Sequence, residues 1–170
     1  MDLGSKKVIM IIAPENFRDE EYFDTREALE KKGVDVSVAS ISNPAISGID
    51  KREVQVDMML PDVTDDFDGI VFVGGGGAKV YFQNQTVLDL ARKYYEEGKI
   101  VAAICIAPII LGHSGIMSDK KATCWEGGAK DLEDFGTEYT AANVEVDGNV
   151  ITANGPKSSA KFGKKIAKAL

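Results

Sequence analysis

Cysteine, histidine and tryptophan are scarce in this sequence of 170 residues, which contains two cysteines, one histidine and one tryptophan. Two cysteines, Cys105 and Cys124, are too few for a disulfide framework, so each must be interpreted as a packing residue or a reactive thiol. A single histidine and two separated cysteines provide no zinc-ligand spacing. We therefore expect neither a metal nor another bound cofactor.

Positive charge and long hydrophobic runs are also lacking. The chain has 27 acidic and 20 basic residues, a net charge of −7 that argues against a nucleic-acid-binding surface. The longest apolar runs, at 8–13 and 100–107, are too short to span a membrane. The N-terminal MDLGSKK lacks the hydrophobic segment of a secretory signal. These observations predict a cytoplasmic protein that binds neither nucleic acid nor membranes.

Short apolar runs alternate with amphipathic stretches along the chain, which fits one domain over 1–170. Strands are predicted at 7–13, 35–40, 69–73, 100–104 and 122–125, with a hairpin or edge strand at 53–60. Helices are predicted at 18–32, 85–97, 106–113 and 158–170. VEVDGNVIT near the C-terminus predicts a β-hairpin turning at Asp147-Gly148. The pattern indicates an α/β, flavodoxin-like doubly wound fold, with a mostly parallel sheet, helices on both faces and a C-terminal hairpin.

Ligands of such folds bind beyond the carboxyl ends of the strands. The segments expected there are 13–18, 74–79, the turn at Cys105, 125–128 and 153–157. The glycine run GGGGAK at 74–79 does not complete a Walker A loop, because Val80 stands where the hydroxyl residue should be. Its glycine amides can instead approach a substrate oxygen, and otherwise the run is a tight turn.

The segment AICIA at 103–107 has the small-x-nucleophile-x-small spacing of a nucleophile elbow. A sharp strand-to-helix turn there would hold Cys105 at the sheet edge, and the helix dipole would lower the pKa of its thiol. The amide of Ile106 would point toward the same site. The alternative is an inert cysteine buried at a strand end.

Four segments together resemble the ThiJ/PfpI family of the class I glutamine amidotransferase-like superfamily: AAICIAP, IVFVGGGGA, the region 11–40, and VDGNVITANGP. The resemblance covers nearly the whole chain. It implies a homodimer or higher homo-oligomer and activities that include cysteine peptidase, glyoxalase or deglycase, redox sensing and chaperone action. It also implies that Cys105 is the reactive cysteine and that the amides of Gly75 and Ile106 form an oxyanion hole.

The chain departs from this family's pattern near the cysteine. Ile106 replaces the histidine that follows the cysteine in many members, and Lys79 stands where some peptidases have an acid. Arg18 aligns best with the family's acidic residue beside the thiol, where its charge would hold a thiolate. Trp125 aligns with the residue that overhangs the cysteine. The peptidase triad is therefore not reproduced.

Other residues near these loops have open roles. A base could come from one of four glutamates, Glu15, Glu20, Glu21 and Glu126, although Glu20 and Glu21 also fit an exposed first helical turn. His113 is expected near the end of its helix and away from Cys105. Cys124 is expected to be a packed residue rather than a resolving thiol.

Three functions follow from these patterns. The leading one is a cysteine-dependent, hydrolase-like protein in which Cys105 attacks a small carbonyl or amide substrate. The second is a redox or stress-response protein whose Cys105 is oxidised to sulfenic or sulfinic acid by a small oxidant. The third is a non-catalytic dimeric binding or chaperone module. The sequence does not choose between turnover and its absence.

Overall fold

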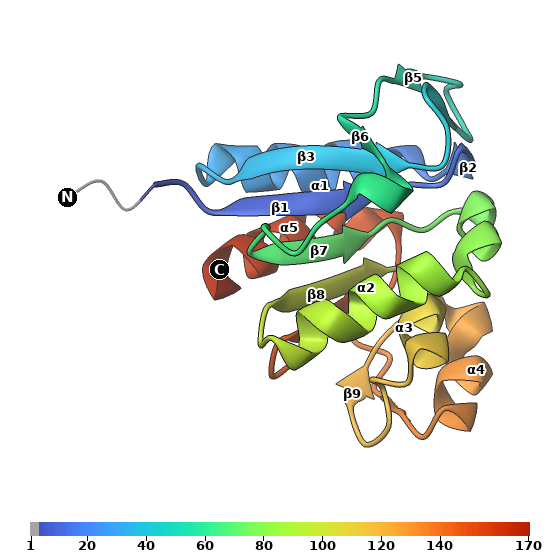
Figure 1. Ribbon diagram of the computed structural model, residues 1–170. Coiled ribbons are helices and arrows are strands. Elements are labelled where there is room, and N and C mark those ends of the chain that lie inside the picture. Colours follow the sequence, from blue (N-terminus) through green and yellow to red (C-terminus); the bar gives the residue numbers. More distant parts are fainter. Residues whose placement is uncertain (1–3) are drawn as a thin grey trace.

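The computed structural model of the protein describes residues 4–170 and is built around a central β-sheet (Figure 1). In the described residues seven strands pair in the order β11 (Val144–Asp147), β12 (Val150–Ala153), β8 (Ile100–Ile104), β7 (Gly69–Phe72), β1 (Lys7–Ile11), β3 (Asp35–Ser40) and β6 (Met58–Met59). The hairpin pair β11–β12 is antiparallel and the other pairs are parallel. This arrangement confirms the predicted α/β fold.

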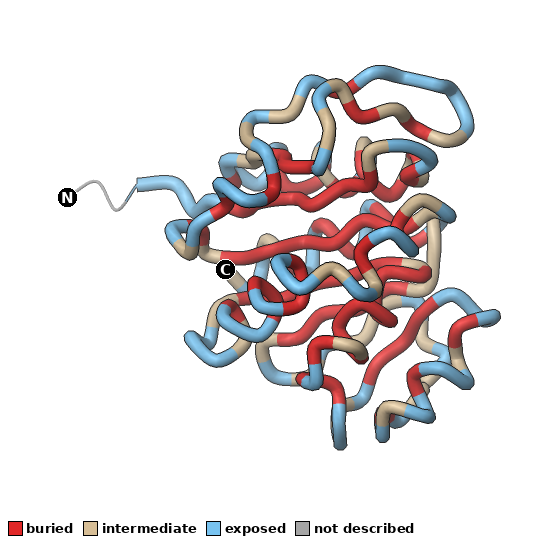
Figure 2. The backbone as a smooth tube through the Cα atoms, turned by 45° about the vertical axis from the view of Figure 1, so that its right-hand side comes forward, coloured by how far each residue is buried: buried red, intermediate tan, exposed pale blue. Residues whose placement is uncertain are grey.

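Helices cover both faces of the sheet. On one face α1 (Asp19–Lys31) packs against α5 (Ser159–Ala169), while α2 (Gln85–Glu96) and α3 (Pro108–Ser114) lie together on the other, with α4 (Ala129–Asp134) beside α3 (Figure 1). The strands between them are apolar and inaccessible, as Figure 2 shows for the centre of the sheet. Burial on both faces explains why these strands are continuous apolar runs rather than alternating ones.

One local prediction was confirmed in kind, and two were wrong in their bounds. Residues 53–60, predicted as a hairpin or edge strand, form two short edge strands, since β5 (Glu53–Val54) pairs antiparallel with β4 (Ala45–Ser47), whereas β6 joins β3. Asp57 lies between β5 and β6, and its carboxylate accepts a hydrogen bond from the Val38 amide of β3. The strand predicted at 122–125 is only β9 (Lys121–Ala122), paired with β10 (Glu138–Tyr139).

The helix predicted at 106–113 begins at Pro108, because residues 105–107 form the turn that leaves β8. Proline is well suited to the first position of a helix, because a backbone amide there would have no acceptor within the helix. Helix α4 was not predicted, since AKDLED has too few apolar residues to show a helical period. Among residues 4–170, none of the helices combines the length and apolarity that crossing a bilayer requires.

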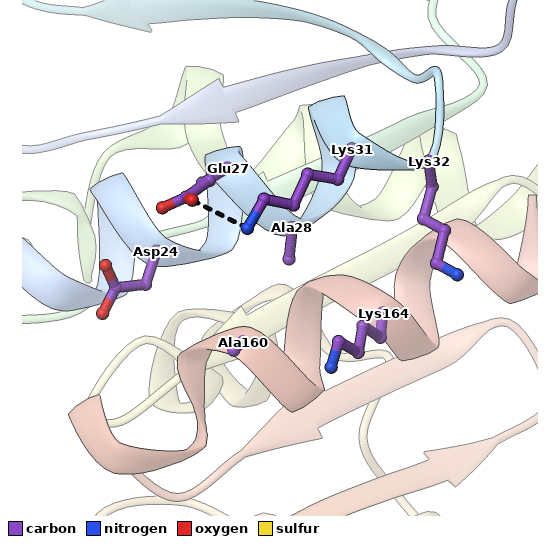
Figure 3. A pocket seen from close by; sticks show the side chains of 7 residues that line it. All are labelled: Asp24, Glu27, Ala28, Lys31, Lys32, Ala160 and Lys164. Carbon is purple, nitrogen blue, oxygen red and sulfur yellow. Dashed lines mark ion pairs between the residues drawn. The ribbon is translucent and has the colours of Figure 1, made fainter.

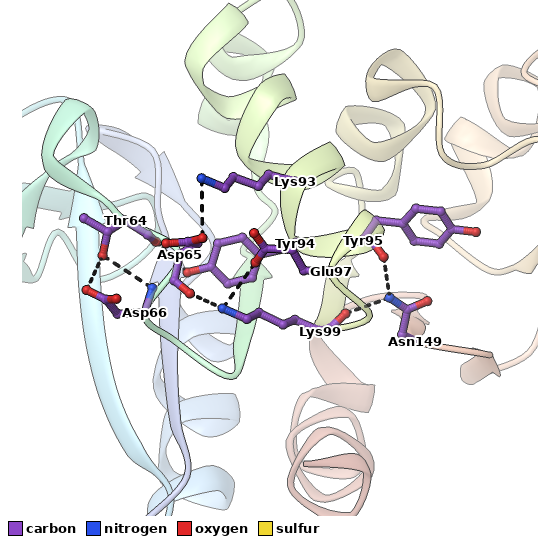
Figure 4. A network of polar contacts seen from close by, with 9 residues as sticks. All are labelled: Thr64, Asp65, Asp66, Lys93, Tyr94, Tyr95, Glu97, Lys99 and Asn149. Atoms are coloured by element: carbon purple, nitrogen blue, oxygen red, sulfur yellow. Dashed lines mark hydrogen bonds and ion pairs between the residues drawn. The ribbon is translucent and has the colours of Figure 1, made fainter.

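A polar network fixes the end of the sheet where β8 begins (Figure 4). The Tyr94 hydroxyl donates to the Thr64 carbonyl at 2.7 Å, and the Lys99 ammonium donates to the Asp65 carbonyl. The Asn149 amide donates to the Lys99 carbonyl at 2.8 Å, which joins this turn to the β11–β12 hairpin. These bonds fix the strand ends opposite the Cys105 loops, so the register of β7, β8 and β12 is held from both ends.

Candidate functional site

The backbone at Cys105 has the conformation of a nucleophile elbow. Cys105 follows β8 with φ of +64°, a left-handed conformation that non-glycine residues adopt rarely and mainly where surrounding structure enforces it. Its amide donates to the Ala153 carbonyl at 2.9 Å, and its carbonyl accepts from the Trp125 amide at 2.7 Å. Backbone hydrogen bonds to β12 and to the loop after β9 therefore stabilise the strained conformation of Cys105.

The glycine loop after β7 lies against the start of α1 and the elbow. Gly75 has φ of +98°, and a side-chain carbon there would lie 2.5 Å from the Arg18 amide nitrogen. At Gly74 such a carbon would lie 2.6 Å from Glu21 Oε1 and 2.9 Å from Cys105 Cβ. Glycine at 74 lets the Glu21 carboxyl and the Cys105 side chain approach each other, and glycine at 75 lets the loop lie against the backbone before α1.

Glu21 is the carboxyl group at the thiol. It is fully buried on α1, and neither of its oxygens meets a donor at full hydrogen-bond geometry within the described chain. The Cys105 thiol and the Gly74 amide act on its pKa through hydrogen bonding, and Arg18 and Glu20 act on it through their charges in opposite directions. Burial raises the pKa of Glu21 to about 8, so the side chain is mostly a neutral acid at pH 7.

The thiol of Cys105 is partly buried and is also shifted. Burial, followed by the charge and hydrogen bond of Glu21, raises the pKa of Cys105 to about 12, while the amides of Ile106 and Gly75 act in the opposite direction. The prediction of a lowered pKa was therefore wrong. The helix that follows is only seven residues long and starts three positions later, so its dipole is too weak to offset burial and a carboxylate.

Several hollows mark the surface of the described residues, and two of similar size show the contrast between the elbow and the rest of the surface. A cavity of about 340 Å³ is lined by Cys105, Gly75, Gly76, Ile106, Arg18, Glu21, Lys79, Trp125 and Pro156. The other, of about 370 Å³, is the groove between α1 and α5, where Lys31 pairs with Glu27 at 2.9 Å (Figure 3). This groove shares no lining residue with the Cys105 pocket and contains no nucleophile.

Five of the residues predicted for the site lie together in the Cys105 pocket: Cys105, Gly75, Ile106, Arg18 and Trp125. Glu15 and Glu126 do not line it, and both are exposed, on β2 (Glu15–Phe17) and after Trp125 respectively. The ring of Trp125 is half exposed and lies over Gly127. It forms one wall of the hollow.

Interpreting Arg18 as the residue in the acid's place was wrong, because Glu21 is the carboxyl group that faces the thiol. Arg18 precedes α1 and binds Glu20 through Nε at 2.6 Å, so it lines the pocket without replacing the acid. Of the two alternatives that the sequence left open for Glu21, an exposed first-turn residue or a group near the thiol, the structure excludes the exposed one. A signal in the sequence could have indicated this burial, since Glu21 lies four residues before Thr25 and seven before Ala28, both on the buried face of α1.

His113 and Cys124 lie outside the lining of this pocket. The imidazole of His113 packs between the rings of Phe82 and Phe135, with centroid distances of 5.6 and 5.0 Å. Cys124 is fully buried, its thiol donates to the Trp125 carbonyl at 3.1 Å, and burial raises its pKa to about 12. Within residues 4–170 no group of three or more metal-ligating side chains is assembled.

Comparison with known proteins places this geometry in a family. The model of the DJ-1/PfpI family matches residues 6–169. An uncharacterized protein of Methanocaldococcus jannaschii is 38% identical over 99% of this chain and 84% of its own. Deglycase PfpI of Pyrococcus furiosus is 32% identical over 87% of this chain and 90% of its own. The crystal structure of Drosophila melanogaster DJ-1beta superposes with a TM-score of 0.91 at 30% identity, covering 98% of this chain and 91% of that one.

The family match and the superposition on DJ-1beta both extend over nearly the entire length of this chain. The elbow at Cys105, the glycine loop and the C-terminal hairpin all lie inside the matched region. The resemblance drawn from the sequence motifs is thereby confirmed. The chain belongs to the DJ-1/PfpI family.

Proposed function

We propose that the protein is a cysteine-dependent enzyme of the deglycase type, in which Cys105 adds to a small carbonyl compound or to an adduct formed from one. The observation that supports this most directly is the Cys105 thiol, held in a strained turn against the buried carboxyl of Glu21 and the amides of Gly75 and Ile106. Relatives named deglycase, from Pyrococcus furiosus among others, support the same reaction class.

Glu21 is the base of the proposed reaction. A base works best when its pKa lies near the working pH, and burial brings the pKa of Glu21 to about 8. As the sulfur attacks, the Glu21 carboxylate accepts the thiol proton. The C–S bond forms, the carbonyl π bond breaks, and its electron pair moves to the oxygen. This alternative to a free thiolate explains how a thiol with a raised pKa can act without an adjacent histidine.

The developing oxyanion is stabilised by backbone amides. The Gly75 and Ile106 amides already act on the sulfur in the resting protein, and in the proposed reaction they donate to the carbonyl oxygen as its negative charge develops. With an aldehyde, protonated Glu21 then returns its proton to the oxygen and a thiohemiacetal results. With an acyl compound, the same proton goes to the leaving amine as the carbon–nitrogen bond breaks, and water hydrolyses the thioester.

Replacement of Cys105 by serine tests this proposal. We expect loss of glyoxal-adduct removal from N-acetyl-lysine by about a hundredfold or more, because a serine hydroxyl is far harder to deprotonate than a thiol. Adduct loss is followed by mass spectrometry at pH 8. The matched control is Cys124→Ser, which changes the other thiol and should retain activity within about twofold. Full activity in Cys105→Ser would disprove the proposal.

A redox function is the second candidate, and one observation favours it. Within residues 4–170 neither oxygen of buried Glu21 has a hydrogen-bond partner, so the proton of the neutral acid is free to be donated to an oxygen of an oxidised Cys105. In that case dilute peroxide should add oxygen to Cys105 well before Cys124, which peptide mass spectrometry resolves. Equal or reversed order of modification would exclude this function.

A further inference from the structure

The surroundings of the Cys105 pocket are cationic, although the whole chain carries a net charge of −7. Arg18 and Lys79 line the pocket itself. A second hollow of about 270 Å³ adjoins it, shares Arg18 and Pro156 with it, and adds Lys157 and Asn154. A continuous depression therefore extends from the thiol past Arg18 to Lys157.

The charges in this depression are only partly neutralised. Arg18 is bound through Nε and Nη2 to Glu20, which offsets one positive charge. Lys79 and Lys157 are both exposed, and across the described part of the chain neither has an ion pair or a side-chain hydrogen bond. Glu21 is mostly uncharged at pH 7. Lys79 thus lines the hollow that contains the nucleophile, and Lys157 lines the hollow that adjoins it.

We infer that the substrates of this pocket carry a small anionic group, a carboxylate or a phosphate, which Lys79 and Lys157 hold beside Arg18 while the carbonyl lies at Cys105. That a carbonyl lies at Cys105 rests on the proposed function. The preference for an anion does not rest on it, because this preference follows from the residues that line the two hollows. Neutral carbonyl compounds of the same size would enter without a partner for their far end.

The structure also explains why lysine suits this role. Lys79 lies in the 3₁₀ turn Gly76–Tyr81, whose backbone is held by the Tyr81 hydroxyl donating to the Ile12 carbonyl at 2.7 Å. Lys157 lies in the turn Pro156–Ser158, where Ser158 donates to Asn154 at 2.6 Å. Flexible ammonium groups on fixed turns can follow anions of different length, whereas Arg18 is already held by Glu20.

Two alkylating reagents that differ mainly in charge test this inference without requiring turnover. Iodoacetate is an anion and iodoacetamide is neutral, and both modify thiols. We compare their rates at Cys105 in the Cys124→Ser protein, at low ionic strength, with the same ratio for 2-mercaptoethanol. The iodoacetate-to-iodoacetamide ratio should exceed that of the free thiol by about tenfold, and should fall as salt screens the lysines.

Charge variants identify the source of the preference. Lys79→Gln and Lys157→Gln should each lower the ratio by about threefold, as expected for exposed charges several ångströms from the reagent. Lys164→Gln on α5 is the control, because it removes the same charge from the separate groove of Figure 3 and should leave the ratio unchanged. A ratio equal to that of 2-mercaptoethanol, or one that the pocket variants do not change, would overturn the inference.

A binding measurement decides the question if Cys105 proves inert to both reagents. The Cys105→Ser protein retains Trp125, the sole tryptophan, in the pocket wall, so its fluorescence reports occupancy. Glycerol 3-phosphate should change this fluorescence and glycerol should not, and Lys79→Gln should weaken the response at least threefold. Equal responses to both compounds would reject the anion preference, while absence of turnover in the wild-type protein would reject only the proposed function.

Discussion

Replacement of Glu21 by glutamine is expected to stabilise the folded protein as the pH rises. Relative to wild type, the free energy of unfolding of Glu21→Gln should increase by on the order of 4 kcal/mol between pH 5 and pH 8.5. The reason is the burial of Glu21, which raises its pKa from 4.5 to about 8 in the folded protein. An ionised carboxylate in that position is poorly solvated, and glutamine cannot ionise.

The sign follows from proton binding in the two states. Between the unfolded pKa near 4.5 and the folded pKa near 8, the unfolded chain has lost its proton while the folded protein keeps it. Raising the pH therefore favours unfolding of the wild type by about 1.4 kcal/mol per pH unit in this window. Below pH 4.5 both states are protonated, and the difference between wild type and variant no longer changes with pH.

Urea denaturation at several pH values measures this effect. Glu20→Gln is the matched control, because it removes an adjacent carboxylate whose pKa is lowered by its hydrogen bond to half-exposed Arg18. It should cost less than about 1 kcal/mol, and only above pH 4.5. Parallel stability profiles for wild type and Glu21→Gln would show that Glu21 has an ordinary pKa. We also expect Glu21→Gln to lose catalytic activity, so the stabilising change is the inactivating one.

Replacement of Gly75 by alanine should damage both folding and reactivity. Gly75 has φ of 98° and ψ of 162°, a conformation close to glycine-only, and an added methyl group would lie 2.5 Å from the Arg18 nitrogen and 2.6 Å from the Asn16 carbonyl. We expect a loss of at least about 3 kcal/mol in the free energy of unfolding. Displacement of one of the two amides at Cys105 should also reduce turnover by about a hundredfold.

Gly76→Ala provides the control for this substitution. Gly76 also lines the pocket, but an added methyl group would meet no atom within 4 Å and no positive φ is required. Its stability and turnover should therefore remain close to wild type. Equal effects of the two substitutions would mean that the loop tolerates neither change for a reason other than the strained Gly75 backbone.

The sequence predicts the scaffold well because its strands are buried on both faces. Uninterrupted apolar runs such as IVAAI at β8 and GIVF at β7 indicate buried strands directly, and Asp147-Gly148 indicates the turn of the hairpin. The structure of residues 53–60 was harder to predict. One alternating pattern of apolar and polar residues there covers two short strands, which pair with strands of different sheets. Pairing partners are set by tertiary contacts that local periodicity does not encode.

The candidate site was predicted in outline but not in its electrostatics. The small residues around Cys105 and the glycine run located the elbow and its loop. The partner carboxyl was only one of four candidate glutamates, because Arg18 aligns in the acid's place, whereas in the structure α1 starts at Asp19 after β2 and the left-handed Asn16, and Glu21 is buried. The raised pKa of the Cys105 thiol depends on this buried group, so it could not follow from the elbow motif alone.

The hydrogen bond from the Cys105 amide to the Ala153 carbonyl has a consequence for biosynthesis. Strand β12 pairs with β8 and supplies this acceptor, yet Ala153 follows Cys105 by 48 positions in the chain. A nascent chain on the ribosome can align β1, β3, β7 and β8 before β12 has emerged, but it cannot complete the turn around Cys105. The strained, carboxyl-facing geometry of the thiol is therefore complete only once the β11–β12 hairpin has docked on β8.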